Sequence, residues 1–257
     1  MLASWLIAAK DFKSGFSTPR TGALIFFLLG ISAIFFATFV QSFVAASAQN
    51  PMGMGGGGNT PPIQELIKGL IYNLQFLLVL ILPAVTMGAF ADELKTQTIR
   101  FLQTAPISSW SVVFGKYLSR FFTLLFAVLL CSVFPLYFVI YGNPEPMATL
   151  VGYLGLMLLI SYQVAFGIWV SSLTSQQFLA FLFTMLGIFT FFILDFVAPK
   201  IAGSGVLSNV LQYLAPLSHF ESFLNGVISV EDVSYFVLMT ICFLFFANVS
   251  YDSKRWR

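Results

Sequence analysis

Long apolar stretches, separated by short polar connectors, dominate the pattern of this chain. A bilayer core of about 30 Å is crossed by roughly 20 helical residues, because backbone amides in lipid must be satisfied within their own helix. Six stretches suit such spans, at residues 22–46, 69–91, 112–141, 147–170, 178–194 and 233–249. The pattern therefore predicts an all-α integral membrane protein with six transmembrane helices, in one domain covering residues 1–257.

One boundary between spans rests on a short polar cluster. No charged residue occurs between Glu145 and Asp195, so this region could be read as one very long helix. The sequence SSLTSQQ at residues 171–177 interrupts it, and we expect a tight turn there between the fourth and fifth spans. The fifth and sixth apolar stretches are short, so we expect those spans to cross nearly upright.

The basic residues indicate an orientation. Six spans place both termini on one side, and cytoplasmic segments are enriched in Lys and Arg. With cytoplasmic termini, the outer segments keep only Lys68 and Lys200. The inner segments then hold Lys10, Lys13, Arg20, Lys95, Arg100, Lys116, Arg120, Lys254, Arg255 and Arg257. We therefore predict a multi-pass membrane protein with both termini in the cytoplasm, and we expect the bacterial inner membrane as its location.

The N-terminal segment is expected to lie in the membrane interface. Residues 1–20 mix aromatic side chains such as Trp5 and Phe12 with Lys10 and Lys13, and Thr18-Pro19 would end the helix. A disordered tail is the alternative. The small residues at 46–48 resemble a signal-peptide cleavage site, but the preceding apolar run exceeds the usual length of about 7–15 residues, so we expect an anchor.

Two connectors lie on the predicted outer side. Residues 49–62 are rich in Gly and Pro and are typical of a flexible loop. Residues 196–232 form an outer helical segment, in which apolar residues from 206 to 214 recur at helical spacing and Pro216 ends the first piece. A second short helix is expected from His219 to Val227. Both helices would dip towards the membrane or cap its outer surface.

Composition restricts the chemistry of the chain. Apolar residues make up 58% and charged residues 9%, and the net charge of +2 favours no nucleic-acid partner. Cys131 and Cys242 lie in apolar runs, so we assign them no disulfide, metal or redox role. The phosphate-loop and zinc-protease motifs are missing, so we predict no catalytic residue, bound cofactor or metal in this chain.

A few polar residues near the spans permit two interpretations. His219, near Glu221, could handle protons or could simply end or pack a helix. Asp195 could mark a substrate path, because ionisable groups at membrane depth are costly, or could lie in water at the span's edge. The small residues Gly167 and Ser171, followed by Ser175, would allow close helix packing within one chain or between two copies.

The loop between the second and third spans is the most informative segment. Residues 96–105 read as a short helix capped by Thr96 or Thr98 and closed by Pro106, with a restart at Ser108-Ser109. An ordinary connector is the alternative. The loop resembles that of the type-2 ABC (ABC-2) permeases, the membrane subunits of ATP-driven exporters. The matching positions are Glu93, Lys95, Thr98, Ile99, Leu102, Thr104, Pro106, Ile107, Ser108, Gly115 and Lys116.

Two residues depart from the family pattern, and the rest of the chain extends the resemblance. Gln97 replaces a usual glycine and Arg100 a frequent glutamate, which weakens residue-level inference about ATPase contacts. The interfacial helix, the six spans and the outer helical segment also fit. Among its branches, the chain looks most similar to the gliding-motility type (GldF-like).

The resemblance implies a permease subunit that is not itself an enzyme. Two copies would pair, each seating the 96–105 coupling helix in a cytoplasmic ABC ATPase that binds ATP and Mg, and a membrane partner with a large periplasmic domain could join them. The implied ATPase-coupling residues are Glu93, Lys95, Thr98, Arg100, Leu102, Thr104 and Pro106. The proposed outer gate or partner contact comprises Leu207, Leu211, Pro216, His219 and Phe220.

Other functions remain open at the level of sequence. A non-transporting scaffold, or a component that transmits force in an ATP-powered complex, fits equally well. An intramembrane enzyme would need ionisable residues deep in the spans, and such residues appear only at span edges. The cargo is unspecified, because the spans contain ordinary apolar and aromatic residues.

Overall fold

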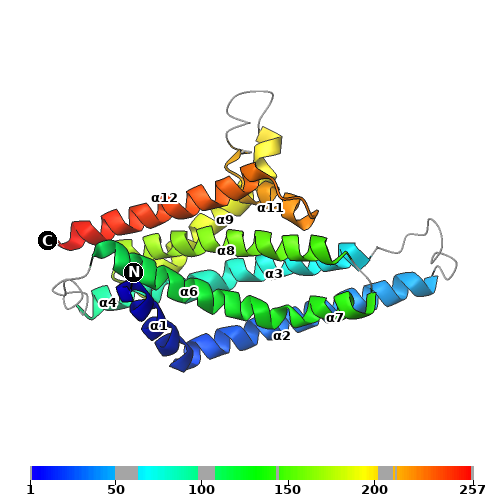
Figure 1. The fold of residues 1–257 in the computed structure, drawn as a ribbon, viewed down its shortest axis with the longest axis horizontal. Coiled ribbons are helices and arrows are strands. Elements are labelled where there is room, and N and C mark those ends of the chain that lie inside the picture. The colour runs from blue at the N-terminus through cyan, green and yellow to red at the C-terminus, as the bar shows by residue number, and fades with distance from the viewer. Residues whose placement is uncertain are drawn as a thin grey trace.

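The computed structural model describes residues 2–49, 63–97, 108–142, 145–201, 211 and 213–255. Within these ranges the secondary structure is helical (Figure 1). Among the described residues, six helical segments are long and apolar enough to cross a membrane, with α3 and α4 together forming one of them, which confirms the predicted fold class. The helices are α1 (Leu2–Ser17), α2 (Pro19–Gln49), α3 (Ile63–Thr86), α4 (Gly88–Lys95), α6 (Ser109–Cys131), α7 (Val133–Gly142), α8 (Pro146–Leu173), α9 (Gln177–Ile201), α11 (Pro216–Leu224) and α12 (Val230–Arg255).

The predicted turn between the fourth and fifth spans is confirmed. α8 ends at Leu173 and α9 begins at Gln177, with Thr174 in extended conformation between them. The Thr174 hydroxyl accepts a hydrogen bond from the Gln176 backbone N–H, which stabilises the turn. The last two membrane helices are longer than the apolar stretches suggested, because α9 has 25 residues and α12 has 26.

Two predicted spans are interrupted rather than continuous. α3 contains Pro83, and the helix is interrupted at Met87 before α4 continues to Lys95. The predicted third span breaks at Ser132 into α6 and α7, and Pro135 follows within the first turn of α7. Proline lacks the N–H that would bond to the carbonyl four residues earlier, which weakens the helix at these points.

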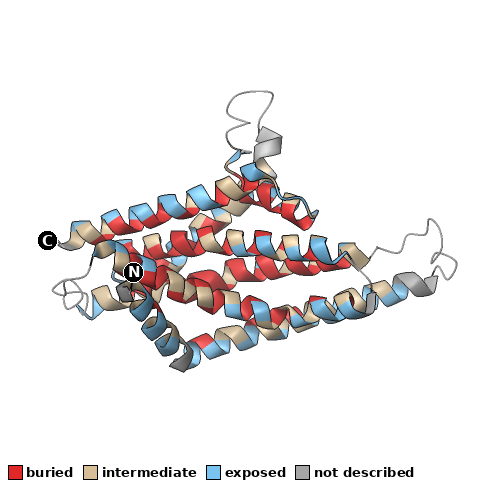
Figure 2. Cartoon of the chain, in the orientation of Figure 1, coloured by how far each residue is buried: buried red, intermediate tan, exposed pale blue. Residues whose placement is uncertain are grey.

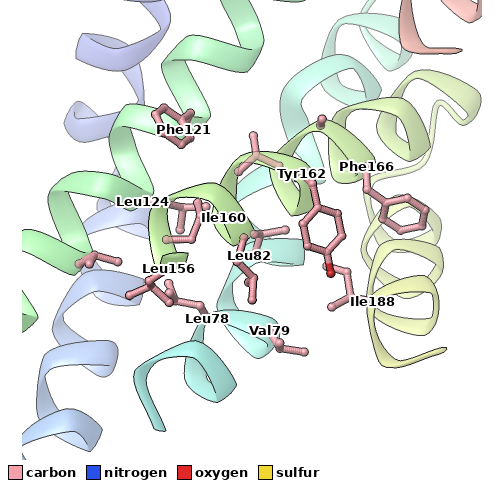
Figure 3. Packing of buried hydrophobic residues seen from close by; sticks show 14 of the residues in the cluster. Leu78, Val79, Leu82, Phe121, Leu124, Leu156, Ile160, Tyr162, Phe166 and Ile188 are labelled. Atoms are coloured by element: carbon pink, nitrogen blue, oxygen red, sulfur yellow. The ribbon is translucent and has the colours of Figure 1, made fainter. Parts of the chain in front are cut away.

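The core lies along α3 and α8. Figure 2 shows buried residues concentrated on these central helices, whereas α2 is largely exposed. The close view in Figure 3 shows Leu78 and Leu82 of α3 meeting Leu156 and Ile160 of α8, with Leu124 of α6 beside them. Lipid chains are as apolar as these side chains, so the hydrophobic effect does not drive the helices together within a membrane. Close packing stabilises their contacts instead.

Glycines allow these helices to approach closely. An added Cβ at Gly167 of α8 would collide with the Thr86 hydroxyl oxygen of α3, and one at Gly155 would collide with Cβ of Phe223 in α11. The Ser171 side chain is also buried, whereas Ser175 is exposed. Gly167 and Ser171 therefore serve packing within this chain.

Both termini lie at one end of the bundle, beside α4 (Figure 1). We call this end the terminal end, and the end that carries α11 the opposite end. α1 packs against α6 at the terminal end, and an added Cβ at Gly115 would come within 2.8 Å of the Ser4 carbonyl oxygen. The predicted interfacial helix is thus a defined helix, and Thr18 separates it from α2 as expected, with its hydroxyl donating to the Gly15 carbonyl.

Candidate functional site at the terminal end

A buried lysine joins three helices at the terminal end. The Lys116 ammonium of α6 lies 2.6 Å from Glu93 Oε1 of α4 and 3.6 Å from Asp11 Oδ2 of α1. Lys116 is 3% exposed, whereas both acidic side chains are about a quarter exposed. The ammonium also lies 5.1 Å from the ring centroid of Phe90. A desolvated cation requires such partners, so Lys116 ties α1 and α4 to α6.

A single serine stabilises the interruption between α3 and α4. The Ser171 hydroxyl of α8 donates to the Met87 carbonyl oxygen at 2.8 Å. Its oxygen accepts from the backbone N–H groups of Phe90 and Ala91 at 3.0 and 3.2 Å. The hydroxyl thereby pairs with backbone groups where the helix is interrupted, and it couples α4 to the end of α8.

The end of α12 clamps the neighbouring helices. Lys254 donates to the Ser172 carbonyl oxygen of α8 at 2.6 Å, and the Ser109 hydroxyl at the start of α6 donates to Asp252. Tyr251 lies against Phe90, with ring centroids 5.6 Å apart. We use the name terminal junction for Asp11, Glu93, Lys116, Ser171 and Asp252 with these contacts. It connects α1, α4, α6, α8 and α12.

The predicted coupling segment lies only partly within the described residues. Glu93 and Lys95 belong to α4, and Thr96 ends that helix instead of capping a new one, because its N–H bonds back to the Asp92 carbonyl. The coupling residues outside the described ranges are Thr98, Arg100, Leu102, Thr104 and Pro106. The helix expected at 96–105 is therefore not described beyond Gln97. Ser108 accepts from the Ser111 N–H at the start of α6, as the predicted restart requires.

Gln97 has a backbone conformation that favours glycine, the residue expected at this position from the resemblance. Its φ is 57°, in the left-handed region, and it directly follows the C-cap Thr96 of α4. A residue with a Cβ is strained in this conformation, whereas glycine adopts it without cost. The chain therefore keeps the turn that the usual glycine would make.

At the opposite end, polar residues hold α11 against two spans. The Asp195 carboxylate of α9 accepts from the backbone N–H groups of Leu217 and Ser218 at 3.1 and 3.0 Å. These groups lie in the first turn of α11, where helical donors lack internal partners. In the structure, Asp195 therefore acts as a cap for α11.

His219 also has a structural environment. Its Nδ1 lies 2.6 Å from Asp232 Oδ1 of α12, and its Nε2 lies 3.1 Å from the Tyr213 carbonyl oxygen. The imidazole stacks on Tyr235, with ring centroids 4.2 Å apart. Both ring nitrogens are thus occupied, and the residue fixes α11 to α12.

The other predicted outer residues have different positions. Pro216 begins α11 rather than ending the preceding piece, since proline suits a first helical position where no N–H is needed. Phe220 is fully buried and Leu211 is partly buried, whereas Leu207 lies outside the described ranges. α11 ends at Leu224, and Gly226 makes the following turn with φ of 78°.

Several residues of the terminal junction escaped prediction as site residues. Asp11 was interpreted as part of an interfacial helix, Ser171 as a packing residue, and Asp252 received no role. Lys116 carried a usable signal, because a charge two turns inside an apolar helix needs a partner. Among the described residues, no group of three or more His, Cys, Asp or Glu side chains could hold a metal ion.

Comparison with models of known protein families identifies a family for this chain. The family model described as ABC-2 family transporter protein matches residues 5–256, which is nearly the whole chain. No curated protein matches the sequence. The match covers most of α1, the six candidate membrane spans and the terminal junction. The chain therefore belongs to the ABC-2 family of transporter membrane proteins.

Proposed function

We propose that this permease subunit exports a substrate, and that its terminal end receives the ATPase subunit that an ABC transporter requires. The terminal junction carries this proposal. α4 leads towards the connector at 98–107, and its side-chain contacts tie it directly to α6 and α8 and, through Lys116, to α1. A force applied to the connector would therefore reach four helices at once.

The proposed division of labour leaves the chemistry in the partner. ATP and Mg would bind the cytoplasmic ATPase, and its closure would displace α4. The interruption at Met87 lies between α4 and the buried part of α3, so it is a natural place for the motion to enter the bundle. This proposal implies that the terminal end faces the cytoplasm of a cell with an inner membrane.

The residues at the end of α4 divide into two groups. Glu93 is bonded to Lys116, so we assign it to holding α4 in place. Lys95 is exposed and directly precedes the connector, so we propose that Lys95 and Arg100 contact the ATPase. Glu93 would hold α4 in position, and Lys95 and Arg100 would contact the ATPase.

A second copy is proposed to complete the transporter. In the most apolar stretch of α2 and of α9, 11% and 17% of the residues are buried. The corresponding fraction is 72% for the span formed by α3 and α4. Both α2 and α9 pack against α3, so their exposed sides could form a continuous surface for another copy. A single-copy mass in mild detergent and in bilayer discs would contradict this pairing.

The opposite end suits an exit gate or an attachment point. α11 is held by Asp195 and Asp232 from two different spans, so a movement of α9 against α12 would displace it. The same arrangement would serve a periplasmic partner domain, as expected for the gliding-motility branch. The apolar spans carry no argument for one cargo class over another.

Co-purification with the ATPase tests the proposed docking. Lys95→Glu combined with Arg100→Glu should reduce recovery of the ATPase about tenfold or more, because opposed charges at an interface cost affinity. Lys68→Glu provides the control, since Lys68 lies at the opposite end and pairs with Glu65. Unchanged recovery with the double variant would contradict the docking site.

A further inference from the structure

A cavity of about 220 Å³ lies beneath the elbow between α1 and α2 at the terminal end. It is far larger than the ~10–15 Å³ that one water molecule needs by the same kind of measure. Its charged lining residues are Asp11, Arg20, Asp92, Glu93, Lys116 and Arg120. Three of these side chains are acidic and three are basic, so the lining is neutral overall.

Charged groups of both signs in this lining have polar atoms without a bonded partner among the described residues. Asp92 Oδ1 and Glu93 Oε2 are inaccessible to solvent and accept no hydrogen bond from the described residues. None of the ion pairs among the described residues includes Arg120 or Asp92, although both line the cavity. Asp11, Asp92 and Glu93 provide opposite charge near Arg120 without a bonded contact. An arginine remains charged, so its guanidinium N–H groups and these carboxylate oxygens still need hydrogen-bond partners.

The position of the cavity relates it to the membrane surface. Asp92 and Glu93 follow the last apolar residues of the second span, and Arg20 precedes the first apolar residues of α2. Leu24 and Val85 provide an apolar wall on the side of the bilayer core. On the two helices that meet above the cavity, Trp5 of α1 and Phe26 of α2 are 60% and 79% exposed. The charged part therefore lies at headgroup depth, between helices that expose apolar side chains to acyl chains.

The balance of charges selects the chemistry of the occupant. An anion would satisfy Arg120 but would be repelled by Asp92 and Glu93, and a simple cation would be repelled by Arg20 and Arg120. A neutral molecule with a separated phosphate and ammonium satisfies both groups. The free carboxylate oxygens further require N–H donors, which a primary ammonium has and a quaternary ammonium lacks.

We propose that this cavity binds the phosphoethanolamine headgroup of an inner-leaflet phospholipid, with the phosphate at Arg120 and the ammonium at Asp92 and Glu93. The lipid would bridge α1, α4 and α6, the same helices that Lys116 joins. Bound there, it would brace the junction through which we propose that the ATPase acts. The lipid site itself does not depend on that docking.

Lipid selectivity of the purified full-length chain tests the proposal. Native mass spectrometry would compare phosphatidylethanolamine, phosphatidylcholine and phosphatidylglycerol with identical acyl chains. We expect phosphatidylethanolamine to bind about tenfold more tightly than either of the others, because only it satisfies both charges with hydrogen bonds. Equal binding of the three lipids would overturn the proposal without any variant.

Variants locate the selectivity in the cavity. Asp92→Asn keeps the shape of the side chain and should abolish the preference for phosphatidylethanolamine over phosphatidylglycerol, and Arg120→Gln should weaken binding of every phospholipid. The pair Glu65→Gln and Lys68→Gln, at the opposite end, should leave selectivity unchanged. A wild-type preference in folded Asp92→Asn would place the lipid elsewhere and overturn the assignment.

Competition with a soluble headgroup compound tests whether the cavity recognises a membrane lipid or a free zwitterion. Glycerophosphoethanolamine carries the same charged groups without acyl chains. At millimolar concentration it should fail to displace bound phosphatidylethanolamine, because it lacks the contacts to α1 and α2. Displacement would show that the cavity recognises a soluble zwitterion and would overturn the assignment to a membrane lipid.

Discussion

At the scale of single residues, two polar side chains inside this bundle form hydrogen bonds with backbone groups of a neighbouring helix. Ser171 bonds to three backbone groups, two in α4 and one at Met87 just before it. Asp195 bonds to two backbone N–H groups at the start of α11. Unpaired backbone groups are costly where water is excluded, so these side chains determine where a helix can be interrupted or begin. Their positions mark the places where the bundle departs from plain spans.

Replacing Ser171 by alanine should destabilise the protein. The change removes the acceptor for Phe90 and Ala91 N–H and the donor to Met87, at a cost of about 1–3 kcal/mol in the free energy of unfolding. Denaturant titration in detergent measures this difference. Ser175→Ala removes an exposed hydroxyl four residues later, so its unfolding free energy should be unchanged. Equal stability of the two variants would contradict the assigned role.

Replacing Gln97 by glycine should stabilise the turn after α4. Relief of the left-handed strain, less the greater freedom of glycine in the unfolded chain, predicts a gain of about 0.5–1 kcal/mol. Gln97→Ala is the matched control, because it removes the same side chain but keeps the Cβ. If both variants gain equally in the same unfolding assay, the backbone conformation is not the cause.

At the scale of elements, glycines and prolines determine how the helices fit together. Gly115 allows α1 to lie directly on α6, and Gly155 receives Phe223 of α11. Pro83 and Pro135 lie close to the interruptions of α3 and α6. α1 is thereby held by backbone proximity as well as by the ion pair between Asp11 and Lys116.

Gly115→Ala should loosen α1 from the bundle. The added methyl would lie 2.8 Å from the Ser4 carbonyl oxygen, so α1 must shift, and we expect a loss of about 1–3 kcal/mol with faster proteolysis before residue 20. An added Cβ at Gly22 of α2 meets nothing within 4 Å, so Gly22→Ala should be neutral or stabilising. Matching proteolysis rates in the two variants would show that α1 does not depend on this contact.

At the scale of the whole molecule, the two ends of the bundle differ in character. The terminal end combines both chain termini with basic residues, and the opposite end carries α11 with its acidic caps (Figure 1). Cytoplasmic segments attract Lys and Arg, so the charge distribution favours a cytoplasmic terminal end. The proposed ATPase docking requires this orientation.

Single cysteines should report the orientation in intact cells. In a background without Cys131 and Cys242, a membrane-impermeant maleimide should label Glu231→Cys directly and Ser253→Cys only after permeabilisation. Both positions are exposed and lie near opposite ends of α12, so accessibility differs only through the membrane. The reverse labelling pattern would invert the orientation and remove the basis of the docking proposal.

The amino-acid pattern alone predicts the six spans, the turn at residues 174–176 and the helical N-terminal segment. These features depend on local apolar length and on polar breaks, which are properties of neighbouring residues. Glu93 and Lys95 were also recognisable as members of a motif. Their different environments, one bonded to Lys116 and the other exposed, were not.

Contacts between residues far apart in the sequence became known only from the packed helices. Asp11 meets Lys116 across 105 residues of sequence, and Ser171 meets Met87 across 84. These pairings depend on how the helices cross and rotate. Apolar helices of similar composition can pack in many rotations, because lipid solvates every face equally well. Close glycine contacts and the need to satisfy buried polar groups select one of them, and these conditions exist only once the helices are together.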